Sequence, residues 1–567
     1  MNKLNKQQPM HVKRRYAVLL LTFFLVSYIL PLGARDLLVP DETRYAEIPR
    51  EMIVGGDWVV PHLNGLRYFE KPPLGYWVHA GSILLFGENN FAVRLPSAMA
   101  VGLSALLIYL LVCSMCRKVN EERDLTAILA ALIFLTCFEV FAVSNIAVLD
   151  SLFPFFLTAT ITAFYFASEA PPGSAREKRF LLLTGVSCGL AFLTKGFLAF
   201  VVPVLVVAPY FAGLRRYRDF WRMSWLPILT AVLVALPWSI LVYLREPDFW
   251  RFFFWNEHIR RFMAGNAQHK ESFWFFFMAG PALFLPWTFV APAAVAGIRE
   301  QIGGRDSQGR LIRFSICWVA LPFLFFSISD GKLLTYILPC FPPFAVLMAF
   351  GLTHVLNRGK IKVFQWGVAG IGILFGMILL ALIYVQVFCY QGFRPYGQPW
   401  KVIMAIYGLV SAILSFVWVF KNQEGMKKVI LFALAPSLLF FIGHFIVPDL
   451  TVEAKAPGLL LEQFKGRIGY DILIISDEET IGAVCWYLRR SDVYLLGGGG
   501  ELDYGLACED ASGRLIDMKS AVGLIKLNRG KILLIARVKN ILEWRDRLPK
   551  PVFEDDSGPK GYVFWRY

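Results

Sequence analysis

The sequence predicts a polytopic α-helical membrane protein with about thirteen transmembrane helices and a small α/β domain at its carboxyl end. Three observations predict this fold class. The 567 residues are 57% hydrophobic and only 17% charged, which is not the composition of a soluble protein. Apolar stretches of about the 20 residues needed to cross a membrane recur through most of the chain. From about Thr451 the pattern changes to short alternating strands and helices.

The expected membrane-spanning helices cover most of the first 450 residues. They lie near 16–34, 95–116, 125–143, 152–168, 180–194, 196–213, 224–244, 272–298, 313–329, 333–356, 363–388, 402–420 and 429–447. The first follows Lys13, Arg14 and Arg15, as the apolar part of a signal peptide does. It is long for a signal peptide, and no small-residue cleavage site follows it cleanly. We therefore interpret it as an uncleaved anchor.

The net charge of +15 is spread over several short loops and is not gathered in one patch. Besides the amino terminus, the basic loops are 117–124, 169–180, 214–223, 299–312, 357–362 and 421–428. Short loops rich in Lys and Arg mark the cytoplasmic side of a membrane protein. We therefore expect a cytoplasmic amino terminus and, after an odd number of spans, a carboxyl-terminal region outside. The basic charge reflects topology and does not indicate nucleic-acid binding.

The first outer loop, 35–94, is long enough to hold structure of its own. Leu74 to Phe86 is apolar but short for a span, and a span there would invert every later loop. An interfacial helix is therefore expected there. Asp41 to Ile48 is expected to form a short helix with Asp41 as its N-cap and Pro49 ending it.

The carboxyl-terminal region is predicted to be a separate α/β domain, which divides the chain into residues 1–450 and 451–567. Its expected strands are 471–476, 493–496 and 531–536, and its expected helices are 480–490, 518–527 and 540–548. The glycine run 497–500 lacks a phosphate-binding motif and is expected to be a flexible loop. Cys485 and Cys508 could form a disulfide in an oxidising compartment, although their spacing does not require one.

Asp41, Arg44 and Tyr45 fall on one side of the expected short helix, because they are three and four residues apart. A carboxylate, a guanidinium and a phenol facing the same way above a membrane make a candidate polar site. Asp41 could instead be an ordinary N-cap. Asp150 is the only charged residue in an outer connection between two apolar spans, where an ionisable group is costly and indicates function. Its alternative role is to cap the following helix.

Tyr68, Glu70 and Lys71 form a second group in the first outer loop, next to the extended backbone that Pro72 and Pro73 impose. The acidic and basic neighbours could also be simply solvated.

Two later outer connections add further candidates. In the loop 245–271, His258 and Arg261 are three residues apart. A His near carboxylates can bind a metal, although a single His is weak evidence. Lys332 and Tyr336 belong to the connection around 330–332 and the start of the next span. Lys332 could contact a lipid phosphate or only extend toward the membrane surface.

These outer-face residues combine cations suited to a phosphate with carboxylates suited to a sugar or a nucleophile. Sugar nucleotides are cytoplasmic, so a transferase on the outer face needs a sugar carried across on a lipid. A polyprenyl phosphate glycoside meets this need, because its phosphate can leave and Lys or Arg can stabilise the charge that develops. A guanidinium can also hold phosphate through two hydrogen bonds.

Four segments of the chain, 41–49, 64–73, 256–262 and 331–339, closely resemble the bacterial 4-amino-4-deoxy-L-arabinose lipid A transferases. These enzymes are GT-C glycosyltransferases, as are the protein O-mannosyltransferases, and the resemblance extends along nearly all of the chain. It implies a GT-C type fold with a periplasmic α/β tail, in the bacterial inner membrane. It also implies undecaprenyl phosphate carrying aminoarabinose as the donor and a lipid A phosphate as the acceptor.

The resemblance also implies roles for individual residues. Asp41 and Asp150 look like the two essential acids, and Arg44 and Tyr45 shape the same pocket. The cluster that grips the carrier-lipid phosphate is implied at Tyr68, Lys71, Arg261 and Tyr336, and Lys332 joins it by its own position. Glu70 and His258 resemble a pair that holds one divalent ion, zinc, near that phosphate.

Two alternative functions compete with this hypothesis. A transferase of the same type that acts on proteins or another glycan is the first, because broader relatives share the opening motif and use other acceptors. A transporter or lipid flippase is the second. Transporters usually place ionisable residues near the membrane midplane, whereas here they collect in outer loops, which argues against transport.

Overall fold

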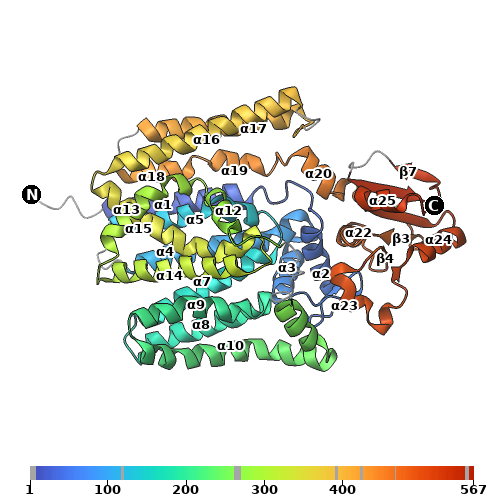
Figure 1. The fold of residues 1–567 in the computed structure, drawn as a ribbon, viewed down its shortest axis with the longest axis horizontal. Coiled ribbons are helices and arrows are strands. Elements are labelled where there is room, and N and C mark those ends of the chain that lie inside the picture. Colours follow the sequence, from blue (N-terminus) through green and yellow to red (C-terminus); the bar gives the residue numbers. More distant parts are fainter. Residues whose placement is uncertain are drawn as a thin grey trace, which may run out of the picture.

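A computed structural model describes residues 8–115, 121–260, 270–389, 394–421, 425–466, 468–555 and 561–567. Long helices lie side by side in a bundle, and the α/β part of the chain sits at one end of that bundle (Figure 1). Helices α2, Asp41–Gly55, and α3, Leu74–Phe86, lie between the two parts. The first outer loop is therefore enclosed by the membrane helices on one side and the α/β part on the other.

Eight helical segments of the described chain are long and apolar enough to cross a membrane. They are Asn90–Ser114 in α4, Leu149–Ser168 (α7), Tyr217–Arg245 (α10), Ser307–Ile328 (α14), Leu334–Asn357 (η4 and α15), Ile361–Phe388 (α16), Pro399–Lys421 (α17) and Gly425–Gly443 (α18 and α19). The bundle also contains α1 Gln8–Phe24, η1 Leu25–Ile29, α8 Ala175–Lys195, α9 Leu198–Gly213 and η2 Arg251–Arg260. These lengths and compositions make the chain a multi-pass membrane protein.

The predicted number of thirteen spans is not confirmed, because length and composition support eight, or ten if each of two bent pairs is one span. In the first pair, α5 Glu121–Leu135 meets α6 Phe138–Ser144 at 64°, and in the second, α12 Phe275–Leu283 meets η3 Trp287–Val290 and α13 Ala291–Gln301 at 96°. Two other expected spans are helical but short, since their apolar helices cover only Arg15–Ile29 and Leu198–Gly213.

Helix α2 differs from the prediction at both ends. Pro40 occupies the N-cap position without a side-chain hydrogen bond, so Asp41 is the first helical residue and not the cap. Pro49 lies inside the helix, which continues to Gly55. Packing overrides the local proline signal, because Ile48, Pro49 and Met52 are all buried in a core that the helix would leave if it ended at Pro49. The helix expected at Leu74 to Phe86 is confirmed as α3.

A tight hairpin links the first outer loop to the α/β part. Strands β1, His62–Leu63, and β2, Leu66–Arg67, pair around Asn64 and Gly65, which have φ of 58° and 68° as a two-residue turn requires. The Asn64 amide donates to the Val493 carbonyl at 2.8 Å and accepts from the Val493 N–H at 3.0 Å. The hairpin thereby fixes the α/β part above the strand that leads to Tyr68.

The α/β part contains a mixed sheet of order β5-β4-β3-β6-β8-β7. Its strands are β3 Leu473–Ser476, β4 Tyr494–Leu496, β5 Leu515–Ile516, β6 Ile532–Arg537, β7 Phe553–Asp555 and β8 Tyr562–Arg566, and its main helices are α22 Ile481–Leu488, α24 Met518–Leu527 and α25 Val538–Trp544. Strands β3 to β6 are parallel, which confirms the predicted alternation, while the three short strands β5, β7 and β8 were not predicted. Helices α20 Asp449–Lys455 and α21 Gly458–Phe464 connect this sheet to the bundle.

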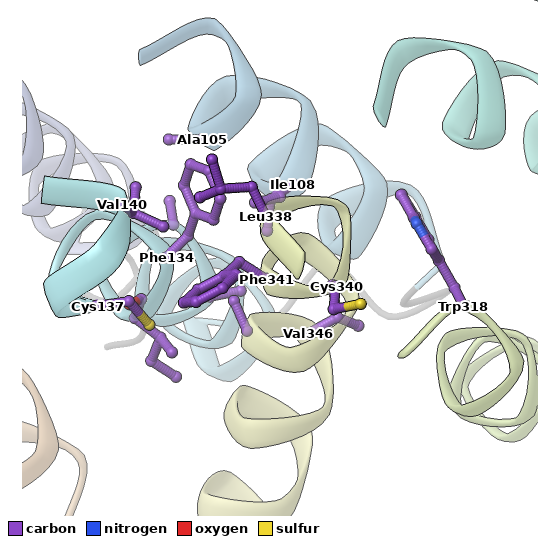
Figure 2. Close-up of a cluster of buried hydrophobic side chains, with 14 of the residues drawn as sticks. Ala105, Ile108, Phe134, Cys137, Val140, Trp318, Leu338, Cys340, Phe341 and Val346 are labelled. Carbon is purple, nitrogen blue, oxygen red and sulfur yellow. The ribbon is translucent and has the colours of Figure 1, made fainter. Parts of the chain in front are cut away.

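Buried side chains form separate cores in the two parts, joined by a shared one. In the bundle, Phe134 of α5, Ala105 and Ile108 of α4, and Phe341 at the start of α15 converge on one apolar cluster (Figure 2). A second core joins α2 and α3 to α22. Cys485 lies in this second core, and both Cys485 and Cys508 are free, so the disulfide considered above is not formed.

Candidate active site

Helix α2 brings three of the predicted residues together. Arg44 forms an ion pair with Asp41 one turn earlier, as their spacing predicted. The Arg44 guanidinium also lies 5.5 Å from the centre of the Tyr45 ring, which stacks against Tyr76 at 5.9 Å. The Asp41 side chain is 55% exposed and that of Arg44 only 13%. Asp41 is therefore the accessible acid of the group and Arg44 its buried partner.

The second predicted group lies beside the first. The Tyr68 hydroxyl donates to Glu501 Oε2 at 2.6 Å, and Arg44 pairs with the same carboxylate. Lys71 Nζ lies 3.4 Å from Glu70 Oε2 and donates to the Glu70 carbonyl at 2.9 Å. Glu501, from the loop after β4, thus joins Arg44 of α2 to Tyr68 of the hairpin segment.

Asp150 begins a third group at the membrane end of the site. It lies in the first turn of α7, forms an ion pair with Lys195 at the end of α8, and accepts a hydrogen bond from the Thr335 hydroxyl at 2.9 Å. The Lys195 ammonium lies 5.0 Å from the centre of the Tyr336 ring. Three elements distant in sequence therefore meet around one carboxylate.

Electrostatic contacts connect the three groups into one site. Burial raises the pKa of the Tyr45 phenol, and although Arg44 opposes this, the nearby charges of Asp41, Asp150 and Glu70 raise it further. The Lys71 ammonium in turn lies close enough to the Asp150 carboxylate to attract it electrostatically. Burial lowers the pKa of Arg44, but Tyr68, Tyr45 and Asp41 together reverse the effect and raise it. The Tyr45 phenol therefore remains neutral, and the Arg44 guanidinium remains charged.

Three further predicted residues remain: Lys332, His258 and Arg261. Lys332 is only 3% exposed and donates to the Glu271 carbonyl at 2.8 Å and to the Ser329 carbonyl, so its ammonium holds two backbone segments together. His258 belongs to η2, but its side chain lies outside the described part of the chain, and Arg261 lies outside the described residues altogether.

Sequence reasoning did not select Lys195 or Glu501 as site residues. A signal for Lys195 existed, because it is an ionisable residue between two apolar segments, as Asp150 is. For Glu501 there was none, since it follows an unremarkable glycine run and reaches the site only through the fold.

A buried ionic network supports α2 from below. The Glu42 carboxylate is fully buried and binds Arg94 at 2.6 Å and Arg35 at 2.6 Å. It also accepts hydrogen bonds from the Leu38 N–H at 2.9 Å and the Ala147 N–H at 3.1 Å. Burial raises the pKa of Glu42, but Arg35 and Arg94 outweigh this effect and lower it to about 2. Glu42 thus ties the start of α2 to the segment that leads into Asp150.

The described residues contain no group of three or more His, Cys, Asp and Glu side chains that could hold a metal ion. Glu70 is 7% exposed and is engaged with Lys71. His258, the other member of the predicted metal pair, has its side chain outside the described part of the chain.

The chain is similar to known glycosyltransferases along its whole length. Residues 14–253 match the family model described as dolichyl-phosphate-mannose-protein mannosyltransferase, and residues 452–565 match that of the arabinosyl transferase ArnT C-terminal domain. An undecaprenyl phosphate-alpha-4-amino-4-deoxy-L-arabinose arabinosyl transferase of Shewanella sediminis is 37% identical over 98% of each chain. A protein of the same name from Aeromonas hydrophila is 41% identical over 87% of this chain and 88% of its own.

Among solved structures, ArnT from Cupriavidus metallidurans bound to undecaprenyl phosphate has a TM-score of 0.81. It is 23% identical and the alignment covers 97% of this chain and 98% of that one, which shows that the two share a fold.

The Glu42 network yields a stability prediction. Replacing Glu42 with Gln keeps the size of the side chain and leaves two buried guanidinium groups without their counter-ion. Removing one partner of a buried ion pair typically costs about 3–5 kcal/mol. We expect a clearly lower melting temperature for the detergent-solubilised variant. The matched control is Glu88→Gln, whose carboxylate pairs with Arg489 and is 36% exposed, and which should cost less than about 1 kcal/mol.

The same group predicts a pH dependence. The pKa of Glu42 is about 2 in the fold, against 4.5 for the free side chain. The ionised carboxylate therefore makes its full contribution to the free energy of unfolding above pH 4.5. This contribution is lost as the pH falls from 4.5 toward 2, and amounts to roughly 3 kcal/mol. Melting temperatures of the parent should therefore fall more steeply below pH 4.5 than those of Glu42→Gln. Equal slopes for the two proteins would contradict this assignment.

Proposed function

The chain belongs to the undecaprenyl phosphate-alpha-4-amino-4-deoxy-L-arabinose arabinosyl transferases, and from this premise we propose that it transfers 4-amino-4-deoxy-L-arabinose from undecaprenyl phosphate. The observation that supports the proposal is that Asp41, Asp150 and Lys71 belong to one electrostatically connected group. Helices α2 and α3, which border this group, lie where the membrane bundle meets the α/β part (Figure 1). A site at the end of the membrane helices is suited to a substrate whose reacting group is polar and whose carrier is a membrane lipid.

We further propose that the acceptor is a phosphate of lipid A and that transfer takes place on the periplasmic face of the inner membrane. The basic loops support a cytoplasmic amino terminus and a periplasmic α/β part. Both substrates are then membrane lipids, and each can enter the site with its apolar chains remaining in the bilayer.

In the proposed reaction an acceptor oxygen attacks the anomeric carbon of the sugar. The bond between that carbon and the phosphate oxygen breaks, and undecaprenyl phosphate leaves with the electron pair. Lys71 stabilises the charge that develops on this phosphate. The further proposed contacts to the phosphate are Tyr68, Tyr336, Arg261 and Lys332. A phosphate acceptor is already an anion and needs little help from a base, whereas a hydroxyl acceptor would give its proton to Asp41.

Mass spectrometry of lipid A tests the proposed substrates. Cells that make the donor and contain this protein should show lipid A heavier by one aminoarabinose per modified phosphate, and cells without the protein should not. Unchanged lipid A in a strain that makes the donor would instead favour a protein or another glycan as acceptor, a possibility supported by the mannosyltransferase match over residues 14–253.

Asp41 and Lys71 carry the prediction for activity. Asp41→Asn keeps the shape of a half-exposed side chain. Losing the ion pair with Arg44 should therefore change the free energy of unfolding by less than about 1 kcal/mol. Transfer should nevertheless fall by roughly 100-fold or more if the negative charge acts in the transition state. Lys71→Ala should weaken carrier-lipid binding and slow phosphate departure. Near-parental transfer by both variants, present at normal levels in membranes, would place the site elsewhere.

We also propose that Glu70 and His258 hold one zinc ion near the carrier phosphate, where a divalent ion would supply further positive charge. No step above depends on that ion. Elemental analysis of the purified protein should find about one zinc per chain, and Glu70→Gln and His258→Ala should each lower that content. Equal zinc in the parent and both variants would contradict the assignment, whatever their activity.

A further inference from the structure

Glu139 is a charged residue that neither the sequence patterns nor the proposed mechanism uses. It is the second residue of α6, which begins just after the 64° bend that separates α5 from α6. Helix α6 contacts both α7, which carries Asp150, and η4, which carries Tyr336. Its neighbours Cys137 and Val140 lie against the apolar cluster with Phe134 and Phe341 (Figure 2). Glu139 is therefore a carboxylate set in apolar surroundings beside the site.

The Glu139 carboxylate has no partner among the described residues. The residue is only 4% exposed, yet the described part of the chain provides it with neither a hydrogen bond nor an ion pair. The other carboxylates of the site are all engaged: Asp41 and Glu501 with Arg44, Glu70 with Lys71, and Asp150 with Lys195. Asp150 lies close enough to Glu139 to repel it electrostatically.

A structural role does not account for this side chain. Glu139 makes no capping hydrogen bond to the first turn of α6, and Cys137, at the N-cap, makes none either. Its oxygens are not among the fully enclosed, unpartnered polar atoms of the described residues, so the carboxylate keeps some accessible surface. Burying an ionised carboxylate without a partner is costly, and an ionisable residue within a membrane bundle is normally retained for function. Glu139 is therefore a buried acidic group that no contact within the described residues explains.

We propose that Glu139 binds the ammonium group of the donor sugar and thereby selects an amino sugar. This inference rests on the proposed function, because the 4-amino-4-deoxy sugar is the cationic part of that donor. A primary ammonium has three N–H donors and a full positive charge, which match a carboxylate that has no other partner. The contact between Lys195 and Asp150 in the same site is an ammonium–carboxylate pair of the same kind.

Such a contact would set specificity at carbon 4 of the sugar. A donor with a hydroxyl in place of the ammonium has nearly the same size, so shape alone separates the two poorly. The hydroxyl donor would leave the Glu139 charge buried and uncompensated. A site built to pair with a charged or polar group of its substrate rejects analogues that lack that group. We therefore assign Glu139 to specificity, while charge stabilisation at the phosphate remains with the residues around Lys71.

The test compares two donors on the purified, full-length protein. One is undecaprenyl phosphate 4-amino-4-deoxy-L-arabinose, and the other is undecaprenyl phosphate L-arabinose, which has a hydroxyl at carbon 4. The parent should prefer the amino donor in kcat/KM by roughly 10- to 100-fold, the range of a hydrogen bond to a charged group. Glu139→Gln should lose most of this preference by slowing transfer of the amino sugar, with little change for arabinose.

Two comparisons separate specificity from a general loss of structure. Glu169→Gln removes a carboxylate at the opposite end of α7, where it pairs with Arg310, and should keep the parental donor preference. Undecaprenyl phosphate without a sugar should bind Glu139→Gln and the parent equally well. An unchanged donor preference in Glu139→Gln, or an equal loss for both donors, would overturn the proposal.

Measured affinities for the two donors distinguish a failure of the proposed function from a failure of the Glu139 inference. If the parent transferred neither sugar, the proposed function would fail, and the affinities for the two donors would still test Glu139. A weaker affinity of Glu139→Gln for the amino donor alone would support the inference. Equal affinities of parent and variant for that donor would contradict it.

Discussion

The site depends on the buried contact between Glu42 and two arginines. Arg94 is only 1% exposed and, besides Glu42, donates to the carbonyls of Leu32, Arg35 and Asp36. One carboxylate and one guanidinium therefore fix the end of the first membrane helix, the start of α2 and the segment before α7. Because Asp41 and Asp150 lie next to the two segments that Glu42 holds, their separation is set by this buried ionic network. The network is costly to bury, but it is also costly to break.

A second constraint comes from above, where the α/β part closes over α2. The segment after β4, which includes the short helix η6 Gly500–Leu502, carries Glu501 to Arg44 and Tyr68. In it, Gly500 passes directly against Glu478. A Cβ at Gly500 would overlap the Glu478 carboxylate, and its φ of +51° also favours glycine. The glycine run interpreted from the sequence as a flexible loop thus has a defined path. Through Glu501, the α/β part forms one wall of the site and also covers α2.

The parts predictable from sequence were those with a local signal. Helical spacing placed Asp41 and Arg44 together, and the cost of a charge between apolar spans identified Asp150. Long-range partners gave no such signal, so Glu501 and the Glu42–Arg94 pair appear only in the fold. The count of thirteen spans is not confirmed for a related reason. Hydropathy records apolar length but not the bends after Leu135 and Leu283, which depend on what packs against them.

The two acids named as catalytic are in different states, and this difference separates their roles. Asp150 is held by Lys195 and by the Thr335 hydroxyl, so both of its oxygens are engaged. Among the described residues Asp41 has one partner, Arg44, which it shares with Glu501, and more than half of the Asp41 side chain is exposed. A group that must approach an acceptor needs a free lone pair and room to move, whereas a group that positions a cation needs fixed contacts. These contacts favour Asp41 as the acid that meets the acceptor. They favour Asp150 as the one that fixes the position of Lys195.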